Sequence, residues 1–474
     1  MKRIILNSVE KEQLEYIEKC RTLIGEWSKE KERSITYCVV TFGCQMNARD
    51  SEKLKGILEE TGCVSASEDE ADILLYNTCT VRDNADRKVY GRLGTLKEVK
   101  KQRPDMVIGV CGCMTQETVA AEKVKKTCPH VDIIFGTHNV YTLAQLLYRH
   151  LSEKTRTVDI WEEAKDVAEH LPVRRKYPFK SGVNISYGCN NFCTYCIVPY
   201  VRGRERSRLA SDILEEVSRL SKEGVSEIML LGQNVNSYGH DLKEEDRMTF
   251  AALLKAVADT EGIRRVRFMT SHPKDLSDEL IDTIASHPKI CNHVHLPLQS
   301  GSSRLLKDMN RRYDKEHYLE LVRKLREKIP DVAITTDIIV GYPGETDEDN
   351  EETLDVIRRA EFDNAFTFQY SKRTGTPAAS RPDQIPQEVV TRRFNKVLAL
   401  VQEMSRKRAM LLEGKTLPVL VEDVNEREEG LVTGRLENNM SVHFKGDASL
   451  IGKYVDVVLT ECKGFYYIGE IKNV

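Results

Sequence analysis

The chain alternates short apolar strands with amphipathic helices over most of its length. Six strand–helix units occupy the centre, with predicted strands at 183–187, 227–232, 266–270, 293–297, 333–340 and 364–370. Such alternation indicates parallel strands with helices on the sheet faces, because parallel neighbours need a crossover connection. Six units are fewer than the eight of a closed barrel. We therefore predict an α/β fold whose centre, residues 181–411, is a partial (β/α)6 barrel.

Four further strand–helix units precede the central region. Their strands are predicted at 35–41, 71–78, 105–110 and 131–136. This pattern predicts a separate parallel α/β domain over residues 35–152. A Lys- and Glu-rich extension, 1–34, helical or loosely ordered, comes before it. A charged, proline-containing linker, 153–180, follows it.

The tail, residues 412–474, has a different pattern. Short alternating strands are broken by Gly, Asn and Lys, which predicts a small antiparallel β-barrel. This tail holds 7 Lys and Arg residues against 11 Asp and Glu residues. Bulk charge therefore does not by itself indicate a nucleic-acid partner for the tail.

Bulk composition restricts the compartment more than the activity. No segment approaches the roughly 20 apolar residues of a membrane span, and the N-terminal apolar run is too short for a secretory signal. We expect a cytoplasmic protein with no membrane partner. Disulfides are rare in that compartment, so the thirteen cysteines are better explained as metal ligands, reactive thiols or buried small residues.

The stretch "GCNNFCTYC" places Cys189, Cys193 and Cys196 within eight residues, just after the first strand of the central region. Parallel α/β folds carry their chemistry at this end of the strands. A zinc knuckle or three buried thiols are the alternatives, but a structural zinc site normally has four ligands. Three thiolates would leave one iron of a four-iron cluster open to a small molecule.

The N-terminal domain has a dispersed set of three cysteines. Cys44, Cys79 and Cys113 each follow a predicted strand, at intervals of 35 and 34 residues. Adjacent parallel strands would bring these three loops to one edge of the sheet. Cys111 competes with Cys113, and we favour Cys113 because it lies beyond Gly112 at the junction of loop and helix. The set predicts a second site with three thiol ligands.

The spacing C-x3-C-x2-C, with Tyr195 before the last cysteine, resembles the radical S-adenosylmethionine enzymes. Two three-cysteine sites followed by a β-rich tail resemble the methylthiotransferases, which end in a TRAM domain. The likeness covers residues 35–474. It implies two [4Fe–4S] clusters, held by the two sets of cysteines, and S-adenosylmethionine as both methyl donor and radical source.

The resemblance also implies residues that line the cosubstrate. Gly232, Gln233 and Asn234 follow the second strand, where the family usually has Gly-Gly-Glu, and Asp337 replaces a glycine of a second family motif. The implied cofactor-binding residues are Tyr195, Gly232, Gln233, Asn234, Gln299 and Asp337. His272 and His295 are general acids or structural histidines, and we favour the structural role. No protein general base is assigned, because the cofactors carry the difficult step.

The substrate implied by the resemblance is N6-isopentenyladenosine beside the anticodon of tRNA, which would receive a methylthio group on carbon 2. Sister enzymes act on threonylcarbamoyladenosine in tRNA or on an aspartate of a ribosomal protein. A non-catalytic iron–sulfur RNA-binding protein is the alternative of another class. The reaction implies an external electron donor and a sulfur source as partners, and we expect a monomer. Basic segments at 202–208, 304–312 and 371–377 are candidate phosphate contacts.

Overall fold

The computed structural model describes residues 7–80, 83–164 and 168–472. Residues 1–6 of the predicted extension, 81–82 after the predicted strand at 71–78, 165–167 of the predicted linker and 473–474 of the tail lie outside this range. The chain forms two compact units. The first comprises Met1–Lys176, Gly188–Asn190 and Cys196–Arg204, and the second comprises Tyr177–Tyr187, Asn191–Tyr195 and Glu205–Val474.

The first unit is built on a six-stranded parallel sheet with the strand order β2-β1-β3-β4-β5-β6. The strands are β1 (Thr36–Thr41), β2 (Val64–Ser65), β3 (Ile73–Thr78), β4 (Val107–Gly112), β5 (Ile133–Phe135) and β6 (Thr157–Asp159). The four predicted strands are present and lie side by side in chain order. Strand β6 falls within the predicted linker, because three residues are too few to show a strand pattern.

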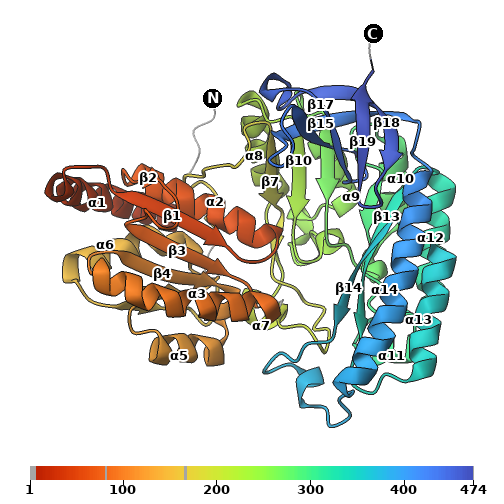
Figure 1. The fold of residues 1–474 in the computed structure, drawn as a ribbon, viewed down its shortest axis with the longest axis horizontal. Helices are drawn as coiled ribbons and strands as arrows, with labels where there is room; N and C mark the ends of the chain where they lie inside the picture. The colour runs from red at the N-terminus through yellow and green to blue at the C-terminus, as the bar shows by residue number, and fades with distance from the viewer. Residues whose placement is uncertain (1–6, 81–82, 165–167, 473–474) are drawn as a thin grey trace. The chain divides into compact units, whose positions relative to one another are not determined.

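Helices cover both faces of this sheet (Figure 1). One face is covered by α1 (Ser8–Lys31), α2 (Gln45–Glu60) and α6 (Leu143–Glu153), the other by α3 (Asp83–Gln102) and α5 (Thr118–Thr127). Strand residues alternate between the two cores, so that Leu74 faces one and Leu75 the other. The N-terminal extension is the helix α1, which a capping box between Asn7 and Glu10 starts and whose Ile17 is buried.

The second unit contains the partial barrel. Its six parallel strands are β7 (Lys180–Asn184), β10 (Glu227–Leu231), β11 (Arg265–Phe268), β12 (His293–His295), β13 (Ala333–Val340) and β14 (Asn364–Gln369). They form two three-stranded sheets, β11-β10-β7 and β12-β13-β14, connected by a parallel bridge between Val266 and Ile290. The helices that follow them are α8 (Ala210–Lys222), α9 (Phe250–Asp259), α10 (Asp278–Ser286), α12 (Lys315–Lys328), α13 (Asp347–Ala360) and α14 (Gln387–Met410).

The tail forms a closed five-stranded barrel with the order β15-β16-β17-β19-β18. The strands are β15 (Thr416–Val424), β16 (Leu431–Arg435), β17 (Ser441–Lys445), β18 (Tyr454–Cys462) and β19 (Tyr466–Ile471). The predicted small antiparallel β-barrel is confirmed, and one of its strand pairs, β17 and β19, runs parallel. A closed ring with an odd number of strands cannot alternate direction throughout, so one parallel pair is unavoidable.

Side chains at the amino ends of the first barrel strands hold this small barrel. Lys180, at the start of β7, forms an ion pair with Glu422 at 2.5 Å. Arg265, the first residue of β11, donates to the backbone carbonyls of Arg435 and Pro418, both at 3.2 Å. The tail is therefore attached at the end of the strands opposite to the loops that carry the predicted site.

Candidate functional site

Three cysteines of the first unit follow neighbouring strands at the carboxyl edge of the sheet. Cys44 is the N-cap of α2, after β1; Cys79 directly follows β3; and Cys113 is the first residue of α4 (Cys113–Gln116), directly after β4. Strands β1, β3 and β4 are adjacent. Cys44 is exposed, whereas Cys79 and Cys113 are buried. The topology thus brings the three loops together as the intervals in the sequence suggest.

Asn47 connects two of these loops. It is fully buried, and its Nδ2 donates to the carbonyl oxygen of Thr78 at 2.9 Å and to Oδ1 of Asn77 at 3.2 Å. The Cys44 thiol donates to its Oδ1 at 3.2 Å. In return, Asn77 donates to the backbone oxygen of Asn47 at 2.9 Å. These contacts fix the position of Cys44 relative to the residue before Cys79. Sequence analysis noted no role for Asn77.

Two glycines permit the close approach of these loops. Gly43 has φ +139°, and a Cβ built there would lie 2.7 Å from Cβ of Cys79. Gly112 has φ +101°, and a Cβ there would collide with the carbonyl oxygen of Thr78. Both positions combine a conformation that favours glycine with contact against a neighbouring cysteine loop. Each glycine directly precedes a predicted ligand.

Cys111 and Cys113 occupy different environments. Cys111 lies within β4, and its side chain is part of the core under α1, α2 and α6. Burial raises the pKa of the Cys111 thiol well above its ordinary value. Burial also raises the pKa of the Cys113 thiol, but the charge of the nearby Arg202 guanidinium opposes that shift. The Arg202 charge acts on Cys111 as well, but a hydrogen bond from the guanidinium also lowers the pKa of Cys113, as suits a residue that becomes a thiolate ligand.

The arrangement of the cysteines limits the kind of metal group that they could hold. Within residues 7–80, 83–164 and 168–472, no group of three or more His, Cys, Asp or Glu side chains is arranged to hold a single metal ion. A four-iron cluster takes its ligands at separate corners, so its thiolates lie farther apart than the ligands of one ion. Three thiols from adjacent loops are the donor set that such a cluster uses. The residues present are therefore suited to an iron–sulfur cluster.

The second set of cysteines lies in the loop after β8 (Ser186–Tyr187). Cys193 is 7% exposed, and Nη1 of Arg311 donates to its sulfur at 3.4 Å. The same guanidinium donates to the carbonyl oxygen of Pro297 at 3.0 Å. Asn310 donates to the carbonyls of Asn191 and Phe192, so the loop is held from two sides. Sequence analysis treated Arg311 only as part of a basic segment. Cys189 and Cys196 group with the first unit and are half-buried.

Three of the predicted cosubstrate residues, Gly232, Gln233 and Asn234, lie at the carboxyl end of β10. Gly232 follows β10, and Asn234 donates to Asp275 at 2.8 Å. Oε1 of Gln233 and Oδ1 of Asn234 are buried and accept no hydrogen bond within the described residues. Asp337 lies in β13, with its Oδ2 3.5 Å from Nε2 of His295. Two unsatisfied buried acceptors at one strand end are unusual, and they suit a ligand that carries N–H groups.

Gln299 and Tyr195 complete this set. Gln299 has φ +69° and exchanges backbone hydrogen bonds with β13, donating to the carbonyl of Asp337 at 2.8 Å and accepting from Ile339 at 2.9 Å. A non-glycine residue in this conformation needs support from its surroundings, which those bonds provide. Tyr195 packs on a small apolar cluster that includes Tyr342.

The two candidate histidines differ from general acids in their surroundings. Burial, together with the charge of Arg311, lowers the pKa of His272 to about 2. Its Nδ1 accepts a hydrogen bond from the Lys274 amide at 3.2 Å. A histidine that stays neutral and caps a turn is a structural residue. His295 is 4% exposed and shares the hydroxyl of Thr335 with His293.

Comparison with known proteins gives three family matches. Residues 36–136 match the Uncharacterized protein family UPF0004, residues 183–357 match the Radical SAM superfamily, and residues 411–472 match the TRAM domain. Among the relatives is the tRNA-2-methylthio-N(6)-dimethylallyladenosine synthase of Lachnoclostridium phytofermentans, 55% identical over 95% of this chain and 99% of the relative. The synthase of the same name from Acetivibrio thermocellus is 53% identical over 92% of this chain and 90% of its own length.

The chain belongs to the tRNA methylthiotransferase family of radical S-adenosylmethionine enzymes. Membership of the radical S-adenosylmethionine superfamily implies S-adenosylmethionine and one [4Fe–4S] cluster. The family assignment predicted from the cysteine motifs is confirmed. Within the described residues, no helix is both long and apolar enough to cross a bilayer.

The fold of this family member also resembles that of a solved structure. The radical S-adenosylmethionine methyltransferase TsrM of Kitasatospora setae, with cobalamin and a [4Fe–4S] cluster bound, superposes with a TM-score of 0.52 at 15% sequence identity. The match covers 73% of this chain and 74% of that one. At this identity the likeness is one of fold.

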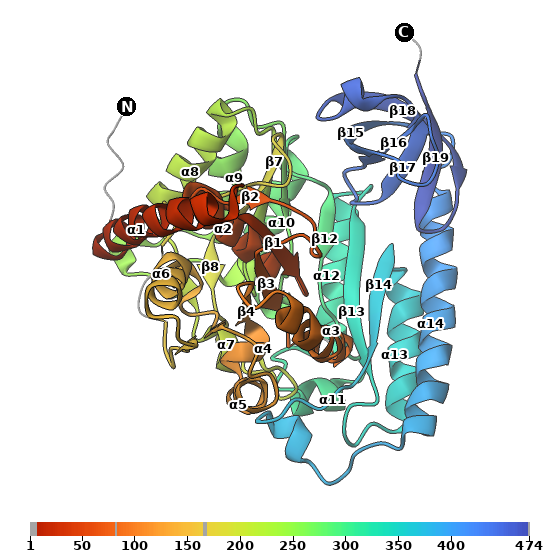
Figure 2. The same ribbon diagram turned by 60° about the vertical axis from the view of Figure 1, so that its left-hand side comes forward.

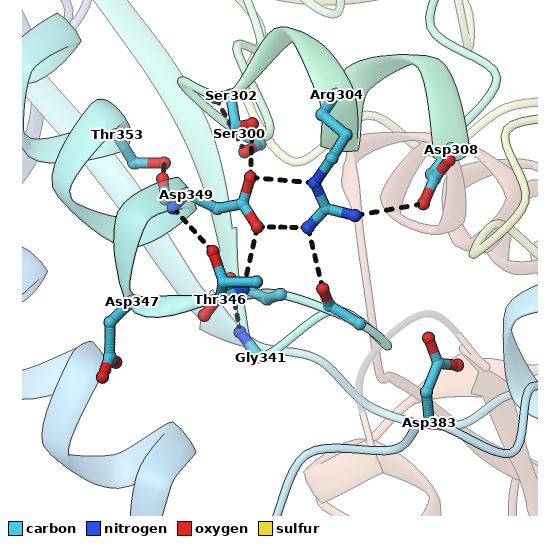
Figure 3. Close-up of polar contacts among 12 residues, drawn as sticks. Ser300, Ser302, Arg304, Asp308, Gly341, Thr346, Asp347, Asp349, Thr353 and Asp383 are labelled. Atoms are coloured by element: carbon cyan, nitrogen blue, oxygen red, sulfur yellow. Dashed lines mark hydrogen bonds and ion pairs between the residues drawn. The ribbon is translucent and has the colours of Figure 1, made fainter.

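A polar network connects the loops after β12 and β13 (Figure 3). Asp349, near the start of α13, accepts from the Ser302 hydroxyl at 2.6 Å and forms a two-pronged ion pair with Arg304. Arg304 also donates to the carbonyl of Gly344 at 2.8 Å. This network connects the loop that carries Gln299 to the loop that follows β13, the strand that contains Asp337. The capping box formed by Thr346 and Asp349 is its only signal in the sequence.

The basic segment 202–208 is not a continuous surface. Arg202 and Arg208 are buried, and each forms an ion pair, with Asp50 and Glu216 respectively. Of the four arginines in this segment, Arg204 is the exposed one. The prediction that this segment as a whole contacts phosphates is therefore wrong for its two buried members. Charge counted along a sequence does not distinguish an internal ion pair from a surface charge.

Proposed function

We propose that this chain replaces the hydrogen on carbon 2 of N6-isopentenyladenosine, beside the anticodon of tRNA, with a methylthio group. The observation that carries this proposal is the end-to-end similarity to synthases named for that product, which spans all three matched regions. The substrate and partner in this proposal are tRNA, with an external electron donor and sulfur source.

Two sets of cysteines would hold two clusters. Cys189, Cys193 and Cys196 would ligate the cluster that binds S-adenosylmethionine. Cys44, Cys79 and Cys113, on three adjacent strand ends, would ligate a second cluster. When bound, the clusters and S-adenosylmethionine would supply one-electron reduction, hydrogen abstraction, a place that holds the incoming sulfur, and a methyl group.

The chain's own residues would bind and orient the cosubstrate. The unsatisfied oxygens of Gln233 and Asn234 would accept hydrogen bonds from its ammonium group. Asn234 stands where the family usually has a glutamate. Its Nδ2 donates to Asp275 at 2.8 Å, and Asp275 also forms an ion pair with Lys274. A neutral amide oxygen can still accept a hydrogen bond from an ammonium group.

The remaining predicted residues would shape the pocket. Gly232 has no side chain to fill the space beside Ser186, where a Cβ would lie 2.6 Å from the hydroxyl oxygen. Asp337 presents a partly exposed carboxylate from the middle of β13. Gln299, held in its unusual conformation by β13, and Tyr195, packed on an apolar cluster, would border the cosubstrate.

The proposal is tested by complementing a strain that lacks its own methylthiotransferase and analysing its tRNA nucleosides by mass spectrometry. This chain should restore the methylthio derivative and consume the isopentenyl precursor. A methylthio product on threonylcarbamoyladenosine alone, or no product on tRNA, would assign the chain to a sister activity.

The two cysteine sets are separated by iron analysis of anaerobically reconstituted protein. We expect about eight irons per chain, falling by about four in either triple cysteine-to-alanine variant. The variant lacking Cys189, Cys193 and Cys196 should form no 5′-deoxyadenosine. The variant lacking Cys44, Cys79 and Cys113 should form it but insert no sulfur. Cys111→Ala is the matched control and should keep all its iron. Loss of iron from this control would mean that Cys111, rather than Cys113, is the third ligand.

A further inference from the structure

The short helix α7 (Val198–Arg202) begins two residues after Cys196, yet it belongs to the first unit. Ile197 and Val201 form an apolar cluster with Cys113. The hydroxyl of Thr137 donates to the carbonyl oxygen of Val201. Helix α7 therefore lies beside α4 and covers one of the three predicted ligands of the first unit (Figure 2).

The last residue of α7 places a positive charge at this site. The Arg202 side chain is 6% exposed, and its Nη2 lies 2.8 Å from Oδ2 of Asp50, itself 5% exposed. Asp50 is on α2, six residues after Cys44. Burial lowers the pKa of the guanidinium, but Asp50 and the thiols of Cys113 and Cys44 hold it well above its ordinary value. The arginine is thus charged and lies close to Cys113, which packs against the neighbouring Val201.

A buried guanidinium needs compensation for the hydration that it loses. Asp50 provides one negative charge, and the hydrogen bond to Cys113 occupies part of the donor fork. Three thiolates and a cluster would bring additional negative charge to the same place. Hydrogen bonds to sulfur and local charge are the means by which a protein sets the potential of an iron–sulfur cluster.

We infer that Arg202 is a positioning residue for the cluster held by Cys44, Cys79 and Cys113, donating to the sulfur of Cys113 and stabilising the reduced cluster through its charge. The inference rests on the second cluster of the proposed function. Arg202 follows Cys196, a ligand of the other cluster, by six residues. The segment that follows Cys196 therefore also contributes Arg202 to the predicted site of Cys44, Cys79 and Cys113.

The test uses the full chain with Cys189, Cys193 and Cys196 replaced by alanine, so that only the first-unit cluster contributes. Iron content and midpoint potential are measured in this background after anaerobic reconstitution. Arg202→Gln should shift the potential to more negative values, because a positive charge near the added electron is lost. Arg202→Lys keeps the positive charge, so its midpoint potential should return most of the way to that of the background. Asp50→Asn should move the potential in the opposite direction, since it removes a negative charge and leaves the arginine in place.

Arg33→Gln is the matched control. Arg33 also forms an ion pair with a buried aspartate of the first unit, Asp72, with N–O distances of 2.6 and 2.7 Å, but at the amino ends of the strands. The midpoint potential of the Arg33→Gln variant should equal that of the background. Equal potentials in Arg202→Gln and Arg33→Gln, or shifts of the same sign in Arg202→Gln and Asp50→Asn, would overturn the inference. A background without iron would instead refute the second cluster and remove the inference with it.

Discussion

Replacement of Asn47 by alanine should destabilise the first unit and empty its cysteine site. The substitution removes both donors of the Asn47 amide, leaving Thr78 O and Asn77 Oδ1 without them. Both acceptor residues are fully buried. A buried polar atom that loses its partner costs about 1–3 kcal/mol, so we expect a loss of about 2–5 kcal/mol in the free energy of unfolding. The iron bound by this unit should fall by up to about four atoms per chain.

The chain offers a specific probe for this measurement. Its two tryptophans, Trp27 and Trp161, both lie in the first unit, so intrinsic fluorescence during denaturant unfolding reports on that unit. Asn139→Ala is the matched control. Asn139 is also fully buried and makes two side-chain hydrogen bonds, to the Gly136 amide and the Asp159 carbonyl. It should destabilise similarly and retain iron. A loss below about 1 kcal/mol in Asn47→Ala, with iron intact, would refute the reasoning.

Three further predictions follow from the same contacts. Arg311→Met should lower the iron content and abolish 5′-deoxyadenosine formation, because it removes the donor to Cys193, whereas exposed Arg312→Met should change neither. Asp349→Asn should cost about 1–3 kcal/mol and speed amide hydrogen exchange in the first turn of α13, since it weakens a charge-assisted network. Burial raises the pKa of Asp72, but its arginine partner outweighs burial and lowers the pKa to about 2. Its stabilisation, about 1–2 kcal/mol, should thus be complete above its ordinary pKa of 3.8 and be lost as pH falls towards 2, and Asp72→Asn should remove that pH dependence.

Each of these has a contrary outcome that can be measured. Normal iron in Arg311→Met would show that the Cys193 loop holds its shape without the guanidinium. Unchanged exchange in α13 after Asp349→Asn would show that Arg304 binds elsewhere. A stability difference between wild type and Asp72→Asn that stays constant from pH 5 to roughly pH 2 would contradict the assigned ion pair.

The order of strands in the first unit could be predicted because hydrophobic periodicity and connection length are local properties. Matching intervals between cysteines at strand ends then placed Cys44, Cys79 and Cys113 at adjacent loops, which β1, β3 and β4 bear out as neighbours. The individual ligand roles remain predictions. The choice of Cys113 over Cys111 used the same local logic, since a residue beyond Gly112 leaves the buried strand.

Contacts between distant segments could not be predicted in this way. Arg202 looks like a surface charge in sequence, and its burial beside Cys113 depends on a segment, Cys196–Arg204, that is distant in sequence but belongs to the first unit. Asn77 reads as an ordinary strand residue until its partner Asn47 is known. The direction of β19 relative to β17 depends on barrel closure rather than on any pattern within either strand.

The C-terminal barrel is attached at the amino ends of β7 and β11, whereas the predicted site lies near the carboxyl ends of the barrel strands. A five-residue strand such as β7 spans roughly 16 Å, so an RNA bound by this barrel would have to extend along the central region to reach the opposite ends of the strands. The barrel would then contact a part of the RNA remote from the nucleotide being altered. Such a contact would contribute to affinity rather than to the choice of base. Removing the barrel would shorten the time that the RNA stays bound, and the identity of the modified base would be unchanged.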